Sequence, residues 1–469
     1  ALSSAASDVY KRQAQHRFGR AGSLFMISGA VILHRSLLFC ITIPGESPRQ
    51  VLLSIFSYDI LFFDEIQVIF MEKQSYLYKR HILQEEKDMV VAILGHGTVG
   101  GGVYELLKNR SDITVKYVLD RSPIAELGAV SVTDFSTILN DGEVDTVVEV
   151  MGGLEPAHEY MVAAMRAGKN IVTANKHLLA AYYDELTTLA KETGIGFRTS
   201  AAVGGGIPWL PNLQRLKRIG AVNEICGIMN GTTNYILSMM HKKGYDYESV
   251  LHDAQSFGYA EADPTADIEG YDIQRKLMIS ANIAFDTSLT EQQVPAAGIA
   301  GITREDIAGF NEMGYVCKLY ATAKRVADGA ILAVVEPTLF KAETLEAAVP
   351  ANYNLITAVS EYTGRQSFFG EGAGRWPTAA AVVQDLLDLC ERKQGFYTQL
   401  SQPLPSNNMC EERRYYVRYI VDTWFMDGCV EKRWGNGVLT RPVSPAQMHS
   451  WYVEARSNDP GIFFAALQG

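Results

Sequence analysis

The stretch that decides the fold is MVVAILGHGTVGGGVYELL, residues Met89–Leu107. A short β-branched strand is followed by a glycine-rich turn and then by an amphipathic helix, as in the first βα unit of a nucleotide-binding sheet. Gly95, Gly97 and Gly100 form the pattern G-x-G-x-x-G where the strand meets the helix. The first glycine permits a tight turn, the second lets a pyrophosphate approach the backbone, and the third packs the helix against the strand.

The residues beside this turn bear on which dinucleotide it would bind. Amide groups of Thr98 and Val99 open the helix, where they would face the phosphates. Residues 114–119 are predicted as the second strand, and Asp120 follows them, 20 positions after the third glycine. An acid here suits the ribose 2′-hydroxyl of NAD, whereas the adjacent Arg121 would hold the 2′-phosphate of NADP. The sequence leaves both cofactors open.

The alternation of strands and helices continues beyond this unit. Strands are predicted at 145–150, 170–173 and 194–198, and helices at 156–167 and 182–192. Parallel strands joined by helices give a doubly wound α/β sheet, whose ligands bind at the carboxyl ends of the strands. Lys176 stands just past such an end, within reach of a cofactor or a substrate. As a lone feature it would be a surface residue at the start of a helix.

A second informative stretch is GYAEADPTADIEGYDIQRK, residues Gly258–Lys276. Its end has helical spacing, which places Asp272 and Lys276 on one helix face. An acidic loop with Glu261 and Asp267 precedes this helix. Such a cluster could grip an ammonium group while the lysine handles a proton, as the oxidation of an amino alcohol requires. The plain alternative is an exposed Asp–Lys pair behind a solvated loop.

Two glycine-containing loops complete the set of candidate motifs. AAVGGGIPWLP, residues 201–211, has backbone carbonyls that could coordinate a monovalent cation or line a cleft. It would serve equally well as a hinge between domains. NGTTNYI, residues 230–236, has Gly231 at a predicted helix start, where amide groups could bind a carboxylate. An ordinary helix N-cap explains this second motif nearly as well.

Composition limits the class of protein. The chain has 469 residues, of which 47% are hydrophobic and 20% charged, so two or three soluble domains are expected. The net charge of -11 argues against a nucleic-acid surface. A membrane helix needs an apolar span of about 18 residues, and the sequence has none. Six scattered cysteines without a C-x-x-C pair indicate a reducing compartment, so a cytoplasmic location is expected.

Taken together, the motifs resemble those of the homoserine dehydrogenases. The shared segments are GxGxVG, VVEVMGG, VTANKHLLA, AAVGGGIP, IMNGTTNYI, GYAEADPTADIEGYDIQRK and GEGAGRWPTAAAVVQDL, within residues 89–389. The resemblance implies NAD(P)H-dependent reduction of aspartate 4-semialdehyde to homoserine, on the route to threonine and methionine. The alternative is a catalytically inactive nucleotide-binding or amino-acid-sensing protein on the same scaffold. The intact acids and lysines favour the enzyme.

The resemblance also implies roles for single residues. Lys276 matches the lysine that donates the proton, and Lys176 matches a lysine that contacts both cofactor and substrate. The residues that match substrate-holding positions are Glu261, Asp272, Tyr259, Asp267 and Gly231. The residues that match backbone ligands of a structural sodium ion are Val203, Gly205 and Ile207. Ser200 stands where the family commonly has a glutamate, so that site lacks an anionic ligand.

The expected domain plan follows from the motifs and the resemblance. Residues 89–205 together with 375–392 are expected to form a Rossmann-type NAD(P)-binding domain, and 206–374 an α+β domain for substrate binding and oligomerisation. Residues 303–340 are predicted as a helix followed by a strand. Residues 393–469 are predicted as a small C-terminal region, either a packing appendage or an ACT-like regulatory module.

Two further expectations concern residues 1–88 and the partners of the protein. We expect residues 1–88 to be an extension of doubtful origin that packs poorly and carries no part of the function. A homodimer or homotetramer is implied by the resemblance, with a small-molecule substrate and with neither nucleic acid nor membrane as a partner.

Overall fold

The computed structural model describes residues 25–27, 30–33, 36–40, 52–55, 88–391, 404–421 and 428–468. The chain divides into two compact units, Ala1–Glu86 and Lys87–Gly469, each of which is described by itself. In the first unit, an antiparallel sheet in chain order contains β1 (Phe25–Ile27), β2 (Ala30–Leu33), β3 (Ser36–Cys40) and β4 (Leu52–Ile55). The prediction that residues 1–88 pack poorly falls largely outside the described residues.

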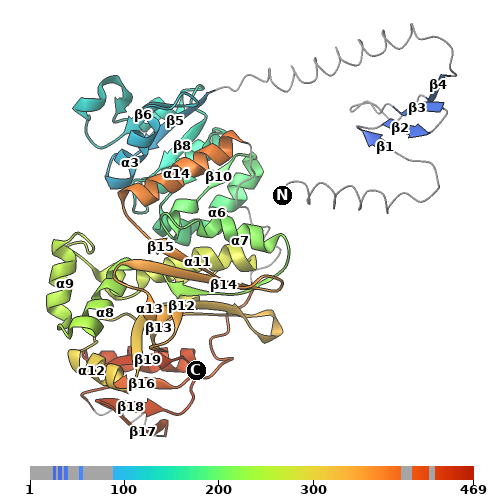
Figure 1. Cartoon of the computed structure of the whole chain (residues 1–469). Coiled ribbons are helices and arrows are strands. Elements are labelled where there is room, and N and C mark those ends of the chain that lie inside the picture. Colours follow the sequence, from blue (N-terminus) through green and yellow to red (C-terminus); the bar gives the residue numbers. More distant parts are fainter. Residues whose placement is uncertain are drawn as a thin grey trace, which may run out of the picture. The chain divides into compact units, whose positions relative to one another are not determined.

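The second unit opens with a six-stranded parallel sheet in the order β10-β9-β8-β5-β6-β7 (Figure 1). Its strands are β5 (Met89–Leu94), β6 (Ile113–Leu119), β7 (Ser131–Val132), β8 (Thr146–Glu149), β9 (Asn170–Thr173) and β10 (Phe197–Arg198). The chain winds outward from β5 in both directions, so the crevice for a ligand lies at the carboxyl ends of β5 and β8. The predicted doubly wound sheet is confirmed.

Helices cover both faces of this sheet because successive residues of β5 point to opposite sides. Val91 and Ile93 pack with α3 (Thr98–Leu107) and α14 (Arg375–Cys390), whereas Ala92 and Leu94 belong to the core on the other face. The helices on that other side are α4 (Phe135–Leu139), α5 (Ala157–Arg166) and α6 (Lys176–Thr193). Figure 1 shows α14, in orange, lying beside α3 although the two are far apart in the sequence.

The start of α6 differs from the prediction and matters for the site. The helix begins at Lys176 rather than at the predicted Tyr182. Asn175 caps it, because its side-chain oxygen accepts a hydrogen bond from the Leu178 amide at 3.2 Å. Tyr182, with φ -124° and ψ 27°, departs from helical geometry at the point where the prediction began.

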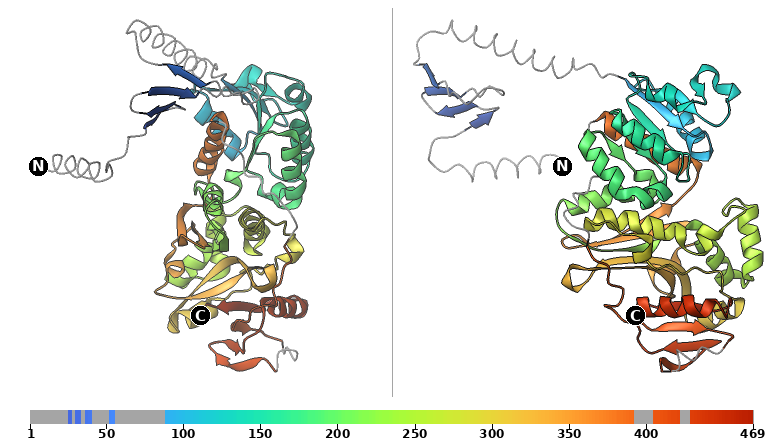
Figure 2. Two further views of the ribbon diagram at one scale, coloured as in Figure 1. Left: turned by 90° about the vertical axis from the view of Figure 1, so that its right-hand side faces the viewer. Right: turned by 180° about the vertical axis from the view of Figure 1, so that it is seen from behind.

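The remaining strands form a mixed nine-stranded sheet in the order β15-β14-β11-β12-β13-β19-β16-β18-β17. The strands of its first part are β11 (Val222–Ile228), β12 (Tyr315–Arg325), β13 (Ile331–Lys341), β14 (Tyr353–Ser360) and β15 (Gly364–Glu371). The helices packed against this part include α7 (Trp209–Lys217), α8 (Gly231–Lys243) and α11 (Tyr271–Phe285). Seen from behind, α11 lies between this sheet and the nucleotide-binding layers (Figure 2).

The prediction for residues 303–340 was wrong in its middle part. The helix is limited to α12 (Arg304–Glu312), and the segment predicted to extend it forms the long strand β12. Ala, Lys and Arg in this segment favour a helix locally. Pairing with β13 along the whole strand, from Tyr315 opposite Lys341 to Arg325 opposite Ile331, overrides that preference.

The C-terminal residues complete the same sheet instead of standing apart from it. They form β16 (Tyr415–Arg418), β17 (Val430–Trp434), β18 (Gly437–Thr440), α15 (Pro445–Arg456) and β19 (Phe463–Leu467). β19 is antiparallel to β16 and parallel to β13. The order β19-β16-β18-β17, with α15 before the last strand, is that of a ferredoxin-like unit. Residues 422–427 of the predicted C-terminal region lie outside the described residues.

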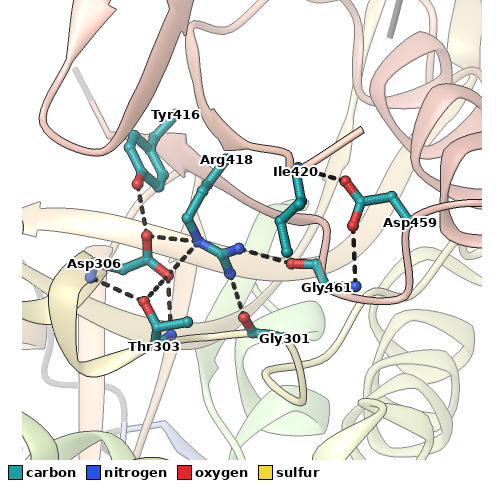
Figure 3. Close-up of polar contacts among 8 residues, drawn as sticks. All are labelled: Gly301, Thr303, Asp306, Tyr416, Arg418, Ile420, Asp459 and Gly461. Carbon is teal, nitrogen blue, oxygen red and sulfur yellow. Dashed lines mark hydrogen bonds and ion pairs between the residues drawn. The ribbon is translucent and has the colours of Figure 1, made fainter. Parts of the chain in front are cut away.

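A buried polar cluster joins this C-terminal part to the start of α12 (Figure 3). The Arg418 Nε donates to both carboxylate oxygens of Asp306 at 2.9 Å, and the Tyr416 hydroxyl donates to the same carboxylate at 2.6 Å. The other guanidinium nitrogens donate to the carbonyls of Gly301 and Gly461. Asp306, 1% exposed, also caps the helix through its contact with Thr303, so one carboxylate fixes two segments.

Candidate active site

A cleft of about 240 Å³ lies where the first turns of α3 and α6 meet α11 and the glycine-rich segments that connect the two sheets. Its lining includes Thr98, Val99, Lys176, Gly205, Lys276 and Gly374. Lysines predicted from two separate motifs therefore face one cleft together with the glycine turn.

The glycine turn has the shape that a dinucleotide requires. Gly95 has φ +98°, which a residue with a side chain adopts only with strain. A Cβ on Gly100 would lie 1.9 Å from the Gly95 carbonyl oxygen, so only glycine lets the helix approach the turn this closely. Above Gly97, no atom of the described chain lies within 4 Å of a Cβ position. The turn thus leaves open backbone where the pyrophosphate of NAD(P) fits.

Asp120 is tied to this turn from the end of β6. One carboxylate oxygen accepts a hydrogen bond from the His96 amide at 2.9 Å, and the other accepts from the Arg121 amide at 2.7 Å. Each oxygen keeps a lone pair for a ribose hydroxyl. The Arg121 side chain is exposed beside it. Both predicted determinants are in place, and the choice between NAD and NADP remains open.

Asp272 lies between two lysine ammonium groups at the wall of the cleft. Its Oδ1 is 2.8 Å from Lys176 Nζ, and its Oδ2 is 2.7 Å from Lys276 Nζ. The spacing of Asp272 and Lys276 in α11 brings the second pair together, and the early start of α6 brings the first. Lys276 also donates to the Met229 carbonyl at 2.7 Å.

Burial and charge shift the pKa values of this group in a defined direction. Burial alone would raise the pKa of Asp272, but the ammonium groups of Lys276 and Lys176 outweigh it and hold that pKa well below its usual range. Burial lowers the pKa of Lys276, and the charge of Asp272 opposes this only in part. The charge of Asp272 raises the pKa of Lys176, whose side chain is 41% exposed where it faces the cleft.

Asn230 is a site residue that the sequence did not assign. Its Oδ1 accepts from the Thr233 amide at 2.8 Å and caps α8. Its Nδ2 donates to Asp267 at 2.7 Å and to Asp272 at 2.9 Å, so one amide bridges two carboxylates. The motif NGTTN indicated an N-cap, but nothing in it shows where the other end of the amide points.

Asp267 joins the cluster through Asn230, and its electrostatic state differs from that of Asp272. Burial raises the pKa of Asp267, and repulsion from the negative charge of Asp272 raises it further. Gly231, the first residue of α8, follows Asn230 in the chain, and a Cβ there would come within 2.8 Å of the Asn352 carbonyl oxygen. Only glycine therefore fits at this helix start without a shift of the neighbouring backbone.

Two of the predicted substrate residues lie at the edge of the site. Tyr259 is 42% exposed, its ring centroid is 5.0 Å from that of Tyr235, and its carbonyl accepts from Thr232. Glu261 is exposed, and only its backbone carbonyl is bound, by Gln255 at 3.2 Å. Among the described residues none pairs with the Glu261 carboxylate, so the structure does not join it to the Asp–Lys cluster.

Glu149 is a second residue without a sequence signal. It is buried at the end of β8 and accepts hydrogen bonds from Thr173 at 2.6 Å, from the Met151 amide at 2.9 Å and from Asn175 at 3.3 Å. Burial raises its pKa despite these bonds. Because Asn175 caps α6, Glu149 holds the start of the helix that carries Lys176.

The predicted sodium ligands Val203, Gly205 and Ile207 belong to the turn that follows Ser200. The Ser200 hydroxyl donates a hydrogen bond to Asp385 at 2.7 Å. A serine at this position carries no negative charge that could balance a sodium ion. The Ile207 carbonyl accepts from the Trp209 amide at 2.7 Å. Val203 and Gly205 are buried in the same turn. Among the described residues no three His, Cys, Asp or Glu side chains gather as a metal site. The sodium ion stays a prediction.

Comparisons with known proteins agree with this geometry. The family model "Homoserine dehydrogenase, NAD binding domain" matches residues 95–199, and the model "Homoserine dehydrogenase" matches residues 208–387. The chain is 40% identical to a homoserine dehydrogenase of Bacillus subtilis over 64% of its own length and 72% of that protein. It is 36% identical to one of Mycobacterium bovis over 72% of its length and 82% of that protein.

Solved structures give the same answer. The crystal structure of a homoserine dehydrogenase from Thiobacillus denitrificans matches with a TM-score of 0.71 and 31% identity, covering 81% of this chain and 98% of that one. The Staphylococcus aureus enzyme matches with a TM-score of 0.64 and 29% identity over 81% of this chain and 99% of that chain. Among the described residues, every helix is too short or too polar to cross a bilayer. The chain belongs to the homoserine dehydrogenase family and is an NAD(P)-dependent oxidoreductase that acts on a CH–OH group.

Proposed function

We propose that the residues of the cleft divide the interconversion of aspartate 4-semialdehyde and homoserine between a proton-donating lysine, a substrate-binding acid and a cofactor-binding turn. The observation that carries this proposal is the Asp272 carboxylate held between Lys176 and Lys276, the two lysines that line the cleft. When bound, the reduced dinucleotide supplies the hydride, and the amides of Thr98 and Val99 would hold its pyrophosphate.

Lys276 is the proton donor in this proposal. An ammonium group has three hydrogens, and Lys276 gives one to the Met229 carbonyl and one to Asp272. The third is available to the substrate oxygen that becomes the alcohol. The lowered pKa of Lys276 favours the transfer, since a less basic ammonium releases its proton more easily. Lys176 would orient the same oxygen with the hydrogens not bound to Asp272.

Asp267 is better placed than Asp272 to hold the amino group of the substrate. Both oxygens of Asp272 are already bound to ammonium groups, and one of them also accepts from Asn230. Asp267 accepts from Asn230 with one oxygen and has no lysine at ion-pair distance among the described residues. A substrate ammonium beside Asp267 would lower the pKa of that carboxyl, because a nearby positive charge favours the ionised form. Amides at Gly231 would face the substrate carboxylate. A substrate role for Glu261 or Tyr259 stays a prediction.

The proposal also covers the assembly of the protein and the role of its C-terminal region. β15 is the outermost strand of the nine-stranded sheet, and Phe369 on it is 55% exposed. An edge strand with an exposed aromatic side chain supports a homodimer through this sheet. The ferredoxin-like strand order of β16 to β19 supports the ACT-like reading of the C-terminal region. The domain boundaries and the cytoplasmic location stay predictions.

The proton role is tested by Lys276→Met. We expect kcat for homoserine oxidation to fall by about 10²- to 10⁴-fold, the usual contribution of a general acid or base. The dissociation constant of the reduced dinucleotide, measured by fluorescence titration, should change less than about twofold, because the glycine turn is untouched. Lys243→Met, which removes an exposed lysine of α8, is the matched control. Near-normal turnover in a folded Lys276→Met protein would exclude Lys276 as the donor.

A further inference from the structure

The first turn of α3 contains two glycines that the dinucleotide pattern does not require. Gly101 and Gly102 follow the third glycine of the pattern directly. A Cβ on Gly102 would lie 2.9 Å from the Ala379 Cβ and 3.1 Å from the Arg375 Cγ, both on α14. Any larger residue would push α14 away. These glycines therefore let the start of α14 rest directly on the first turns of α3, next to the glycine turn.

This packing places the guanidinium of Arg375 over the same turn. Its Nη2 lies 3.6 Å from the point where a Cβ on Gly101 would stand, and the His96 Nε2 lies 3.8 Å from that point. The guanidinium is held over the Trp376 ring, 4.9 Å from its centroid. Among the described residues no carboxylate forms an ion pair with Arg375. The hydrogen bond from Lys108 and its charge lower the pKa of Glu105 on α3, and the charge of Arg375, from beyond ion-pair distance, also helps to lower it.

We propose that Arg375 binds the pyrophosphate of the dinucleotide and is a cofactor-binding residue of this enzyme. The pyrophosphate of such a cofactor lies at the start of the helix after the glycine turn, which is where Arg375 reaches α3. A guanidinium suits two phosphate oxygens because its N–H groups form a planar fork. The first turns of both helices line one cleft, through Thr98 on α3 and Thr378 on α14.

The position of Arg375 also connects the cofactor with the substrate side of the cleft. Gly372, Ala373 and Gly374 precede it in the chain and line the cleft that contains Lys276. Phosphate bound to Arg375 would hold this segment in place by its end. The dinucleotide would therefore order part of the wall that the substrate meets.

The anion at Arg375 could be the pyrophosphate, which NAD and NADP share, or the 2′-phosphate, which only NADP has. Arg121 stands beside the ribose acid Asp120 and serves as the comparison for the 2′-phosphate. A pyrophosphate contact predicts equal losses for both cofactors on removal of the guanidinium. A 2′-phosphate contact predicts a loss for NADPH alone.

The test measures equilibrium binding of NADH and of NADPH by fluorescence titration to wild-type, Arg375→Gln, Arg375→Lys and Arg121→Gln proteins. Arg375→Gln should weaken both cofactors by about 10- to 100-fold, the effect of losing a charge-assisted hydrogen bond. Arg375→Lys should recover part of this loss, since it restores the charge without the fork. The loss should shrink at high salt, where phosphate–cation attraction is screened. Arg304→Gln, an exposed residue of α12, controls for the change in net charge.

The outcomes separate the proposal from its alternatives. Binding of both cofactors within about twofold of wild type in Arg375→Gln would overturn it. A loss confined to NADPH would also overturn it and would assign Arg375 to the 2′-phosphate. Arg375 is exposed, so an unchanged thermal midpoint is expected and shows that a binding loss is not due to unfolding. Wild-type binding and turnover test the family activity independently of Arg375.

Discussion

Asp272 controls the protonation of both lysines in the cleft. Its two oxygens each bind one ammonium group, so the two positive charges lie on either side of a single negative charge. The charge of Lys176 lowers the pKa of Lys276, whereas that of Asp272 raises it. The basicity of the proposed proton donor is therefore set by its neighbours as well as by burial.

Lys176→Met should raise the pKa of Lys276. Without the repulsion from Lys176, the ammonium form of Lys276 is more stable and loses its proton at a higher pH. Homoserine oxidation needs the neutral amine as proton acceptor, so the midpoint of its pH–kcat profile should move to higher pH. The profile of Lys243→Met should follow wild type. A midpoint that stays in place or moves down in Lys176→Met would show that the profile reports another group.

At the residue scale, the sequence shows which residues carry charge but not how side chains meet. Asp272 and Lys276 could be paired from helical spacing, and Lys176 from its place after a strand. Asn230 and Glu149 could not be assigned, because their roles depend on residues far away in the sequence. The carboxylate partners of Asn230 are 37 and 42 positions away, and the side-chain partners of Glu149 are 24 and 26 positions away. Such distances are fixed by the fold, which local patterns do not contain.

At the scale of elements, Asp385 links α14 to the turn at Ser200. The carboxylate accepts from the Ser200 amide at 2.8 Å and from its hydroxyl at 2.7 Å. Burial nevertheless raises the pKa of Asp385 from its usual 3.8 to about 7. Two segments of the chain connect the two sheets. The contact joins the first, at Ser200, to α14, the helix that follows the second.

Asp385→Asn should make stability less dependent on pH. Between pH 3.8 and about 7 the folded protein keeps a proton on Asp385 that the unfolded chain has lost. The unfolded state thus binds fewer protons, and the free energy of unfolding falls as pH rises through this window. Urea unfolding at several pH values should show this fall in wild type and a smaller one in Asp385→Asn.

The hydroxyl contact provides an independent check on the same group. Ser200→Ala removes a bond that lowers the pKa of Asp385, so the fall in stability should extend to higher pH. Parallel curves for wild type and Asp385→Asn would contradict the assignment.

Helices and strands were predicted well where the local sequence preference agreed with the way the element is buried in the fold. β5 and α3 have apolar residues that the parallel sheet buries, so their pattern and their surroundings agree. β12 was predicted as a helix because its composition favours one, while its partner β13 lies beyond a turn. The start of α6 was missed because its cap, Asn175, looks like any loop asparagine.

At the scale of the whole molecule, the C-terminal strands depend on the buried Arg418–Asp306 pair in Figure 3. Arg418→Met would leave Asp306, 1% exposed, without its counter-charge. We expect the free energy of unfolding to fall by about 3–5 kcal/mol, as for other broken buried pairs. Denaturant unfolding measures this loss.

A solvent-exposed pair in the same region is the control. Arg414, 49% exposed, pairs with Glu431 at 2.8 Å. Arg414→Met should cost about 0–1 kcal/mol, since exposed pairs contribute little. Equal losses in the two variants would show that the Arg418 pair does not hold the C-terminal strands in place. The sequence indicated a separate C-terminal region, but the sheet that its strands join could not be predicted, since β13 lies in another predicted domain.

The interleaved path of the chain has a consequence for its synthesis. One face of the parallel sheet, with Val91 and Ile93, is covered by α14, which begins only at Arg375. On the ribosome, the part of that face that α3 does not cover stays open while the intervening segments emerge, at about 5–20 residues per second. We therefore expect the nascent chain to expose part of an apolar sheet face for many seconds, which is the kind of surface that chaperones bind.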